Sequence, residues 1–300
     1  MLDGSESLTI RCGLELTYEA FDPTHIVLLI QPRLEKNQRM EGEQLSFSPE
    51  VSVEEYADVH HNIVRRFELP VGRTTIRHDC FVAVPAQPES HEVTGLPMPV
   101  REMSPELIRY TLPSRYCDSD ALMDFAFQQF GQVPHGLARV EAICDWVHTH
   151  IEYRWGAGSP LFTASQILEQ RFGICRDFAH LAIALCRCFN LPARYVTGHL
   201  PNVAANDSGV PMDFHAYMQV YLGNRWNTFD ARFNTPRIGR IHIACGFDAV
   251  ECAFSTLYGA ANLAWFNVWN YQVDRREVKL GDPVDLAKRF DGTTALRFPS

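Results

Sequence analysis

GICRDFAHLAIALCRCFN, residues 173–190, places a cysteine where a turn becomes a helix. Apolar residues recur behind Cys175 at spacings of three and four, which predicts an amphipathic helix with one buried face that ends before Pro192. A helix N-terminus offers unpaired backbone N–H groups and a partial positive charge, and both favour a thiolate over a thiol. The position of Cys175 therefore indicates a nucleophile, although it also fits a small buried apolar residue.

The composition describes a globular protein with enough apolar residues for a core. Hydrophobic residues make up 46% and charged residues 21% of the 300 positions, a length that favours two domains. The formal net charge is -9 and no dense run of Lys or Arg occurs, so nucleic acid is not an expected partner. No secretion signal is found, and no window approaches the roughly 18 apolar residues of a membrane span, so we expect a cytoplasmic protein without a membrane partner. The oligomeric state is not indicated.

The nine cysteines do not form a metal or disulfide framework. Their number is odd, no Cys-x-x-Cys pair occurs and no secretion signal precedes them, which favours reduced thiols over disulfides. The same scattered spacing argues against a structural zinc site. We therefore expect neither a metal nor another cofactor.

The spacing of apolar residues divides the chain into three parts. Residues 1–90 contain short runs rich in β-branched and aromatic residues, which predicts an N-terminal all-β, sandwich-like domain. Six prolines lie between positions 85 and 113, so residues 91–113 are expected to form a linker. Residues 114–300 change to helical spacing and then return to strands, which predicts an α+β catalytic domain with a C-terminal strand extension.

A predicted hairpin brings a histidine and an aspartate together. Two strand-like runs, residues 214–222 and 225–231, flank a Gly-Asn pair that suits a two-residue turn. With that turn, His215 and Asp230 are diagonal neighbours on one face, about 7–8 Å apart in their backbones, and their side chains can close this gap to a hydrogen bond. A three-residue loop would shift the register and separate them. Asp213, on the same face as His215, is the main rival to Asp230.

These residues suggest a cysteine nucleophile with a base and an orienting group. Cys175 would attack a carbonyl carbon, His215 would take its proton and later protonate the leaving amine, and Asp230 would orient the imidazole. The Cys175 N–H is placed to donate to the oxyanion. Gln166 and Trp155 are the candidates for a second oxyanion donor, although a glutamine on a helix face is usually only solvated.

Three blocks of the sequence resemble the bacterial branch of the transglutaminase-like superfamily, whose papain-related members are often described as candidate cysteine proteases. The blocks are VEAICDWVHTHIEYRWGAGSP (140–160), RFGICRDFAHLAIALCRCFNLPARYVTGHL (171–200) and DFHAYMQVYLGNRWNTFDAR (213–232). The resemblance covers about 115–260, and the β-rich start is similar to the region that often precedes this core. It implies a papain/transglutaminase-like core, with helices packed on an antiparallel sheet.

In this family the cysteine, histidine and aspartate of three successive blocks form a triad, which the resemblance carries over to Cys175, His215 and Asp230. Two segments differ from the frequent pattern of the family. His215-Ala-Tyr replaces the common His-Ala-Trp, so Tyr217 stands at the Trp position, and Asp230-Ala-Arg replaces the common Asp-Pro-Thr. Neither difference removes a member of the triad, but contacts to substrate can differ.

The reaction remains open at this stage because hydrolysis and acyl transfer share a thioester acyl-enzyme. We favour hydrolysis of a peptide or other amide bond, with a peptide or protein as the substrate. Acyl transfer from glutamine to an amine is the alternative within enzymes. A non-catalytic binding module on the same fold is the alternative from another class, and a purely redox role for Cys175 is weakened by the lack of a resolving cysteine near it in the sequence.

Overall fold

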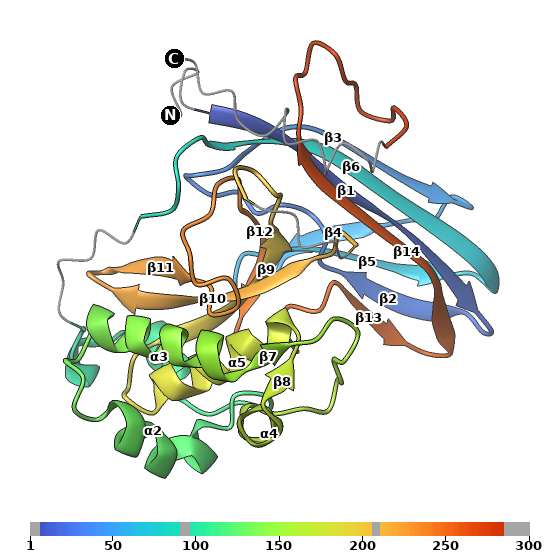
Figure 1. Ribbon diagram of the computed structural model, residues 1–300. Coiled ribbons are helices and arrows are strands. Elements are labelled where there is room, and N and C mark those ends of the chain that lie inside the picture. The colour runs from blue at the N-terminus through green and yellow to red at the C-terminus, as the bar shows by residue number, and fades with distance from the viewer. Residues whose placement is uncertain (1–6, 91–96, 206–210, 285–300) are drawn as a thin grey trace.

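The computed structural model describes residues 7–90, 97–205 and 211–284 of the chain. A β-sandwich and a mixed core of helices and an antiparallel sheet lie side by side, and the helices are at the lower left of the view in Figure 1. This architecture confirms the predicted fold class, a transglutaminase-like α+β core with an N-terminal all-β region. Within the described ranges, no helix has the length and apolar character needed to cross a membrane.

The sandwich consists of two four-stranded antiparallel sheets with the strand orders β14-β1-β6-β3 and β13-β2-β5-β4. Side chains such as Leu14, Leu28 and Phe67 form the apolar core of the sandwich. The strands of the first sheet are β1 (Ser7–Ala20), β3 (Arg39–Ser48), β6 (Gly72–Pro85) and β14 (Ala261–Gln272). Those of the second are β2 (Thr24–Leu28), β4 (Glu54–Ala57), β5 (Ile63–Leu69) and β13 (Ser255–Tyr258).

Two strands from the C-terminal part of the chain complete the sandwich. Strand β14 pairs with β1 from Ile10↔Gln272 to Ala20↔Ala261, and β13 pairs with β2. The sequence placed these residues with the catalytic domain as an extension, but they pair with strands of the N-terminal sheets (Figure 1). The alternating apolar residues of β14 predict a strand, whereas they do not say which sheet edge the strand joins.

In the core, α5 packs on one face of a sheet with the order β11-β10-β9-β12, α3 and α4 pack on α5, and α2 packs on α3. The helices are α2 (Met123–Phe130), α3 (Leu137–His150), α4 (Ala164–Gln170) and α5 (Cys175–Arg187). The strands are β9 (Ala193–His199), β10 (His215–Leu222), β11 (Arg225–Phe229) and β12 (Ile241–Gly246). Shorter elements are η1 (Val100–Glu102), α1 (Pro105–Ile108), η2 (Arg109–Thr111), η3 (Ser119–Leu122), and the parallel pair β7 (Glu152–Tyr153) and β8 (Phe172–Gly173).

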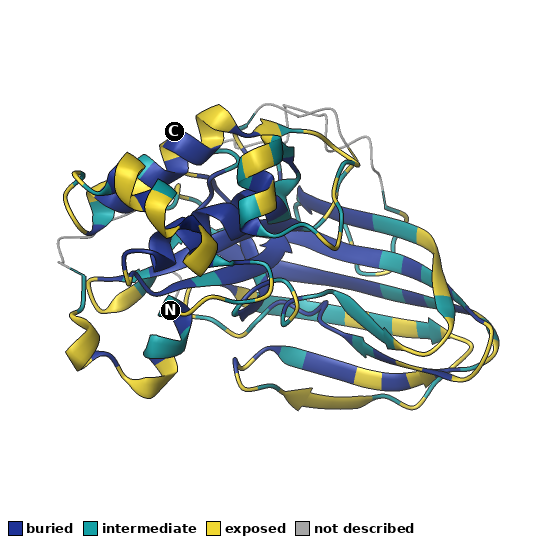
Figure 2. Ribbon diagram, turned by 90° about the horizontal axis from the view of Figure 1, so that it is seen from below, coloured by how far each residue is buried: buried dark blue, intermediate teal, exposed yellow. Residues whose placement is uncertain are grey.

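Helix α5 is the central element of the core. It packs against β9 and β10 on one side and against α3 and α4 on the other. Every residue from Asp177 to Arg187 is buried, and Figure 2 shows the buried residues gathered where the helices meet the sheet. The prediction of one buried face was therefore wrong, because this helix is enclosed on all sides and only its first turn reaches the surface.

Two side-chain amides attach the sandwich to the outer edge of β12. The Gln38 amide accepts from His242 N–H and donates to His242 C=O, both at 2.8 Å. The Asn62 amide does the same to Cys245, at 2.9 and 2.8 Å. A β-bulge between His242 and Ala244 shifts the register of β12. His242 and Cys245 therefore both turn their backbone groups towards the outer edge of the sheet. The amides thus occupy an edge that would otherwise present unpaired backbone groups.

Candidate active site

Cys175 is the first residue of α5 and is half-buried. The turn before it is fixed by Asp177, whose Oδ2 accepts the Ile174 N–H at 2.9 Å. Asp177 therefore helps the helix start, as its position in the first turn predicts. A Cβ on Gly173 would lie 2.7 Å from the Asp177 Cβ, so this glycine gives room to the capping aspartate.

The predicted hairpin register is confirmed. Strands β10 and β11 pair from Leu222↔Arg225 to Met218↔Phe229, as a two-residue turn requires. The ladder ends there, so Asp230 lies just beyond β11 while His215 opens β10. His215 Nε2 lies 2.7 Å from Asp230 Oδ2, and both side chains are buried.

Asp213, the rival orienting residue, makes a different contact. Its Oδ1 accepts the N–H of the next residue, Phe214, at 2.7 Å, and the side chain is on the exposed surface. Among the described contacts, Asp230 is the carboxylate bonded to His215. Asp230 is itself held by a turn, because its Oδ1 accepts the Arg232 N–H at 3.2 Å.

The charges around the pair fix its protonation. Burial alone would raise the pKa of the Asp230 carboxyl, but His215 and Arg240 outweigh this effect and hold that pKa well below its ordinary value. Burial lowers the pKa of His215, and Asp230 opposes this only in part. At neutral pH we therefore expect an ionised Asp230 beside a neutral imidazole. An ionised carboxylate only accepts, so Nε2 carries the proton and Nδ1 is the basic nitrogen.

The thiol is also neutral in this geometry. Burial raises the pKa of Cys175 to about 11, although a hydrogen bond from the Ala216 N–H and the nearby Arg232 act in the opposite direction. We therefore expect a mainly protonated thiol at pH 7 in the free protein. Burial opposes the thiolate that the helix N-terminus favours. The Ala216 bond also places the sulfur beside the first residues of β10.

Two residues behind the pair were not found by sequence reasoning. Arg240, only 7% exposed, donates through Nη2 to Asp230 Oδ2 at 3.1 Å and through Nε to Glu89 Oε1 at 2.6 Å. Glu89 belongs to the proline-rich segment after β6 and lies 151 residues from Arg240 in the sequence. No local pattern links these positions, so a buried chain Glu89–Arg240–Asp230–His215 becomes visible only in three dimensions.

The two candidates for a second oxyanion donor lie in other settings. Gln166 is exposed, and its Oε1 accepts the Thr163 N–H at 3.0 Å in the N-terminal cap of α4. Trp155 follows β7 and is 57% exposed. No described contact brings either side chain to Cys175, so both stay predictions. The Cys175 N–H, at the first position of α5, has no partner within the helix and remains the first candidate donor.

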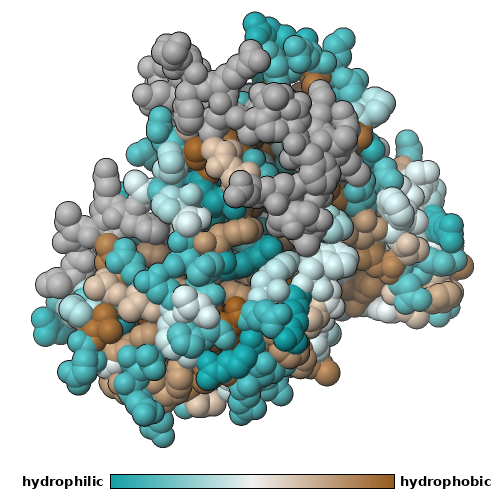
Figure 3. Space-filling view, viewed as in Figure 1, coloured by the Kyte–Doolittle hydropathy of each residue, from teal (hydrophilic) through white to brown (hydrophobic). Residues whose placement is uncertain are grey.

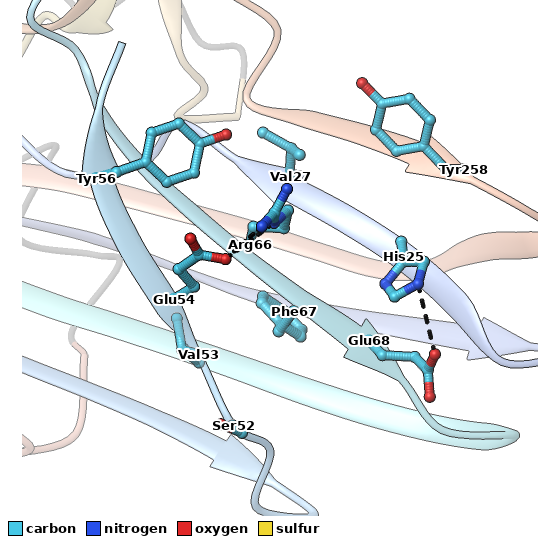
Figure 4. Close-up of a pocket in the computed structure, with 10 residues that line it drawn as sticks. All are labelled: His25, Val27, Ser52, Val53, Glu54, Tyr56, Arg66, Phe67, Glu68 and Tyr258. Atoms are coloured by element: carbon cyan, nitrogen blue, oxygen red, sulfur yellow. Dashed lines mark hydrogen bonds and ion pairs between the residues drawn. The ribbon is translucent and has the colours of Figure 1, made fainter.

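An open groove lies on the sandwich. It has a volume of about 800 Å³ and is lined by residues of β2, β4, β5 and β13, with Tyr56 and Tyr258 on opposite sides (Figure 4). Ion pairs Arg66–Glu54 and His25–Glu68 lie within it. Apolar side chains also gather on the sandwich side of the surface in Figure 3, whereas the helical part is mixed in polarity. None of Cys175, His215 and Asp230 lines this groove.

Comparisons with known proteins agree with this geometry. Residues 123–231 match the model of the transglutaminase-like superfamily. A crystal structure from Cytophaga hutchinsonii, described as a candidate cysteine protease, is 29% identical, has a TM-score of 0.79, and is matched over 90% of this chain and 92% of that chain. The superposition therefore includes the sandwich as well as the core.

Mycobacterial relatives match a shorter part. An uncharacterised protein of Mycobacterium leprae (strain TN) is 32% identical over 90 residues, which are 29% of this chain and 32% of the relative. One of Mycobacterium tuberculosis (strain ATCC 25618 / H37Rv) is 28% identical over 115 residues, 37% of each chain. The matched part thus spans about a third of these curated relatives.

The matched range of the family model begins at α2 and ends just after β11, so it contains Cys175, His215 and Asp230. The structural neighbour extends the likeness to nearly the whole chain. By the sequence match over residues 123–231 and by its fold, this chain contains a transglutaminase-like domain.

Proposed function

We propose that the protein is a cysteine-nucleophile hydrolase that cleaves a peptide or other amide bond through Cys175, His215 and Asp230. The observation that carries the proposal is the 2.7 Å contact between His215 Nε2 and Asp230 Oδ2. This contact occupies one ring nitrogen and leaves Nδ1 as the base. The thiol is nearby, because its sulfur accepts the N–H of Ala216, the residue after His215.

The neutral thiol and imidazole favour a mechanism in which proton transfer accompanies attack. His215 Nδ1 takes the thiol proton as the sulfur bonds to the substrate carbonyl carbon, and the Cys175 N–H donates to the developing oxyanion. The imidazolium, stabilised by Asp230, then protonates the leaving amine as the C–N bond breaks. Water, deprotonated by His215, attacks the thioester, the C–S bond breaks, and the proton returns to the sulfur.

Acyl transfer is the alternative reaction, since an amine can replace water in the second step. A non-catalytic module on this fold is the alternative from another class, and the bonded His215–Asp230 pair argues against it. A peptide or protein substrate and a cytoplasmic location remain part of the proposal.

The direct test is acylation of the protein by p-nitrophenyl acetate. The release of nitrophenol measures the rate, and intact-mass analysis measures the acetyl groups that the protein gains. We expect one acetyl group on Cys175, formed slowly in His215→Ala and at the normal rate in the matched control His25→Ala, whose side chain is 65% exposed on the sandwich. Acetylation that is equally fast in His215→Ala and wild type would contradict the proposal.

The same assay separates hydrolysis from acyl transfer. Addition of a primary amine such as glycine methyl ester leaves the product as free acetate if water resolves the thioester, and yields the acetamide if the amine does. We expect acetate as the main product. An amide product that rises in proportion to amine concentration would favour the transferase alternative.

A further inference from the structure

A second cavity, of about 600 Å³, lies behind the active-site pair. Its walls come from the loop before β3, the end of β6 with the segment that follows, strands β10 and β11, and the segment that leads into β12. Neither Cys175 nor His215 lines it, whereas Arg240, which donates to Asp230, does. The cavity is large enough for a small organic molecule and is separate from the thiol.

The lining of this cavity is basic in a chain whose net charge is -9. Its cationic side chains are Lys36, Arg194, Arg225, Arg237 and Arg240, against the acidic Glu35 and Glu89. Both acids are already paired: Glu35 with Arg33 and His242, and Glu89 with Arg240. A surplus of positive charge therefore faces the cavity.

Two donors of lining residues have no acceptor among the residues that the structure describes. Arg237 Nε and Arg240 Nη1 are buried atoms without a hydrogen-bond partner there, and their residues are only 6% and 7% exposed. A buried charged donor that lacks an acceptor is energetically unfavourable. The two guanidinium groups also interact: burial lowers the pKa of Arg237, and the charge of Arg240 adds to this effect. An anion in the cavity would offset this repulsion.

We propose that this cavity binds a small organic anion through a carboxylate or phosphate head group that lies against the basic side chains of its lining, Arg237 and Arg240 among them. Guanidinium groups suit such oxyanions because their planar donors match adjacent oxygens. Trp226, whose ring stacks on Arg194 at 4.2 Å, forms one wall and gives room for an apolar body. A ligand in the cavity would lie near Arg240, which donates to Asp230.

Calorimetric titration of the full chain with inorganic phosphate and, in a second arm, acetate tests the site and identifies the head group. We expect saturable binding of one of them, weakened about tenfold or more in Arg237→Gln, since a hydrogen bond to a charged group contributes about 1.5–3 kcal/mol. Gln87→Glu places a negative charge at an exposed lining position, where it cannot disturb the core, and should weaken binding several-fold.

The matched control is Arg73→Gln, which removes one positive charge from a side chain that is 72% exposed on the sandwich. Binding that survives this change but falls in both cavity variants supports the proposal. No saturable binding of either anion, or an equal loss in Arg73→Gln, overturns it. The readout is binding, so the outcome is independent of whether Cys175 is catalytic.

Discussion

The two ends of helix α5 show how one element can serve chemistry and architecture. At its first residue, the half-buried Cys175 faces β10, and its sulfur accepts a backbone N–H. At its last residue, Arg187 is only 2% exposed and donates to the carbonyls of Tyr110 and Ala193 and to the Ser114 hydroxyl. None of these acceptors is a carboxylate.

The difference teaches what each end requires. The reactive end must stay open to a substrate, so only the first turn of α5 reaches the surface. At the other end, the Arg187 guanidinium lies where the helix carbonyls carry partial negative charge. Its hydrogen bonds connect three chain segments to α5. The buried length between them makes α5 a rigid support, which holds the thiol in position.

The largest expected effect lies at the reactive end. Cys175→Ala should lower the rate of nitrophenol release at least about 10³-fold, because loss of the nucleophile leaves only binding and oxyanion contacts. Its free energy of unfolding, from urea denaturation, should change by less than about 1 kcal/mol. A residual rate above a tenth of the wild-type rate would show that another residue is the nucleophile. The first residue of α5 would then have no role in the chemistry.

The orienting residue should come next. Asp230→Asn keeps the shape of the site but removes the carboxylate that accepts from His215, and we expect a loss of rate of about 10³-fold. The acylation rate, measured across pH, checks this. An unchanged rate would show that Asp230 only anchors Arg240. The matched control is Asp213→Asn, because Asp213 is a carboxylate in the same region that accepts from the Phe214 N–H.

The opposite end should respond in stability rather than rate. Arg187→Met removes the donors to three backbone carbonyls and a hydroxyl, so the free energy of unfolding should fall by about 3 kcal/mol. The rate per folded molecule should change less than about twofold. Arg73→Met, on the exposed sandwich surface, should stay within about 0.5 kcal/mol of wild type. If Arg187→Met lost as much of the rate as Cys175→Ala, both ends of α5 would be required for the reaction, which would contradict this division of roles.

The smallest expected effect concerns the loop that contains Phe247, which is hydrogen-bonded to Arg187. Phe247 C=O accepts from Arg187, and Phe247 N–H donates to Glu251 Oε2 at 2.7 Å. The hydrogen bond from His60, with smaller help from Phe247 N–H and Arg109, lowers the pKa of Glu251 to about 2 against the opposing effect of burial. Stability from this carboxylate is therefore present above its ordinary pKa of about 4.5 and lost as the pH falls towards about 2.

Melting temperatures of wild type and Glu251→Gln, measured between these limits, should converge as the pH falls. Wild type should be the more stable protein near pH 5. Curves that run parallel over the whole range would show that Glu251 does not couple to this end of α5.

The sequence was informative where the relevant contacts are local. The Gly-Asn turn predicts the β10–β11 register, and that register brings His215 to Asp230. It was uninformative where contacts are distant: Arg240 with Glu89, and β14 with β1. The full enclosure of α5 also depends on elements from both sides, so its own apolar spacing underestimates it. Burial is the largest cause of the raised pKa of Cys175, and this burial too depends on elements that are distant in the sequence.

The pairing of β1 with β14 has a consequence for synthesis of the chain. A ribosome releases β1 long before β14, so the edge of the first sheet stays unpaired until the last strand emerges. All helices and strands of the core, from α2 to β12, precede β14. The core that holds Cys175 can therefore form before the sandwich is closed, and pairing between such distant strands is a slow step. We therefore expect closure of the sandwich to follow formation of the core.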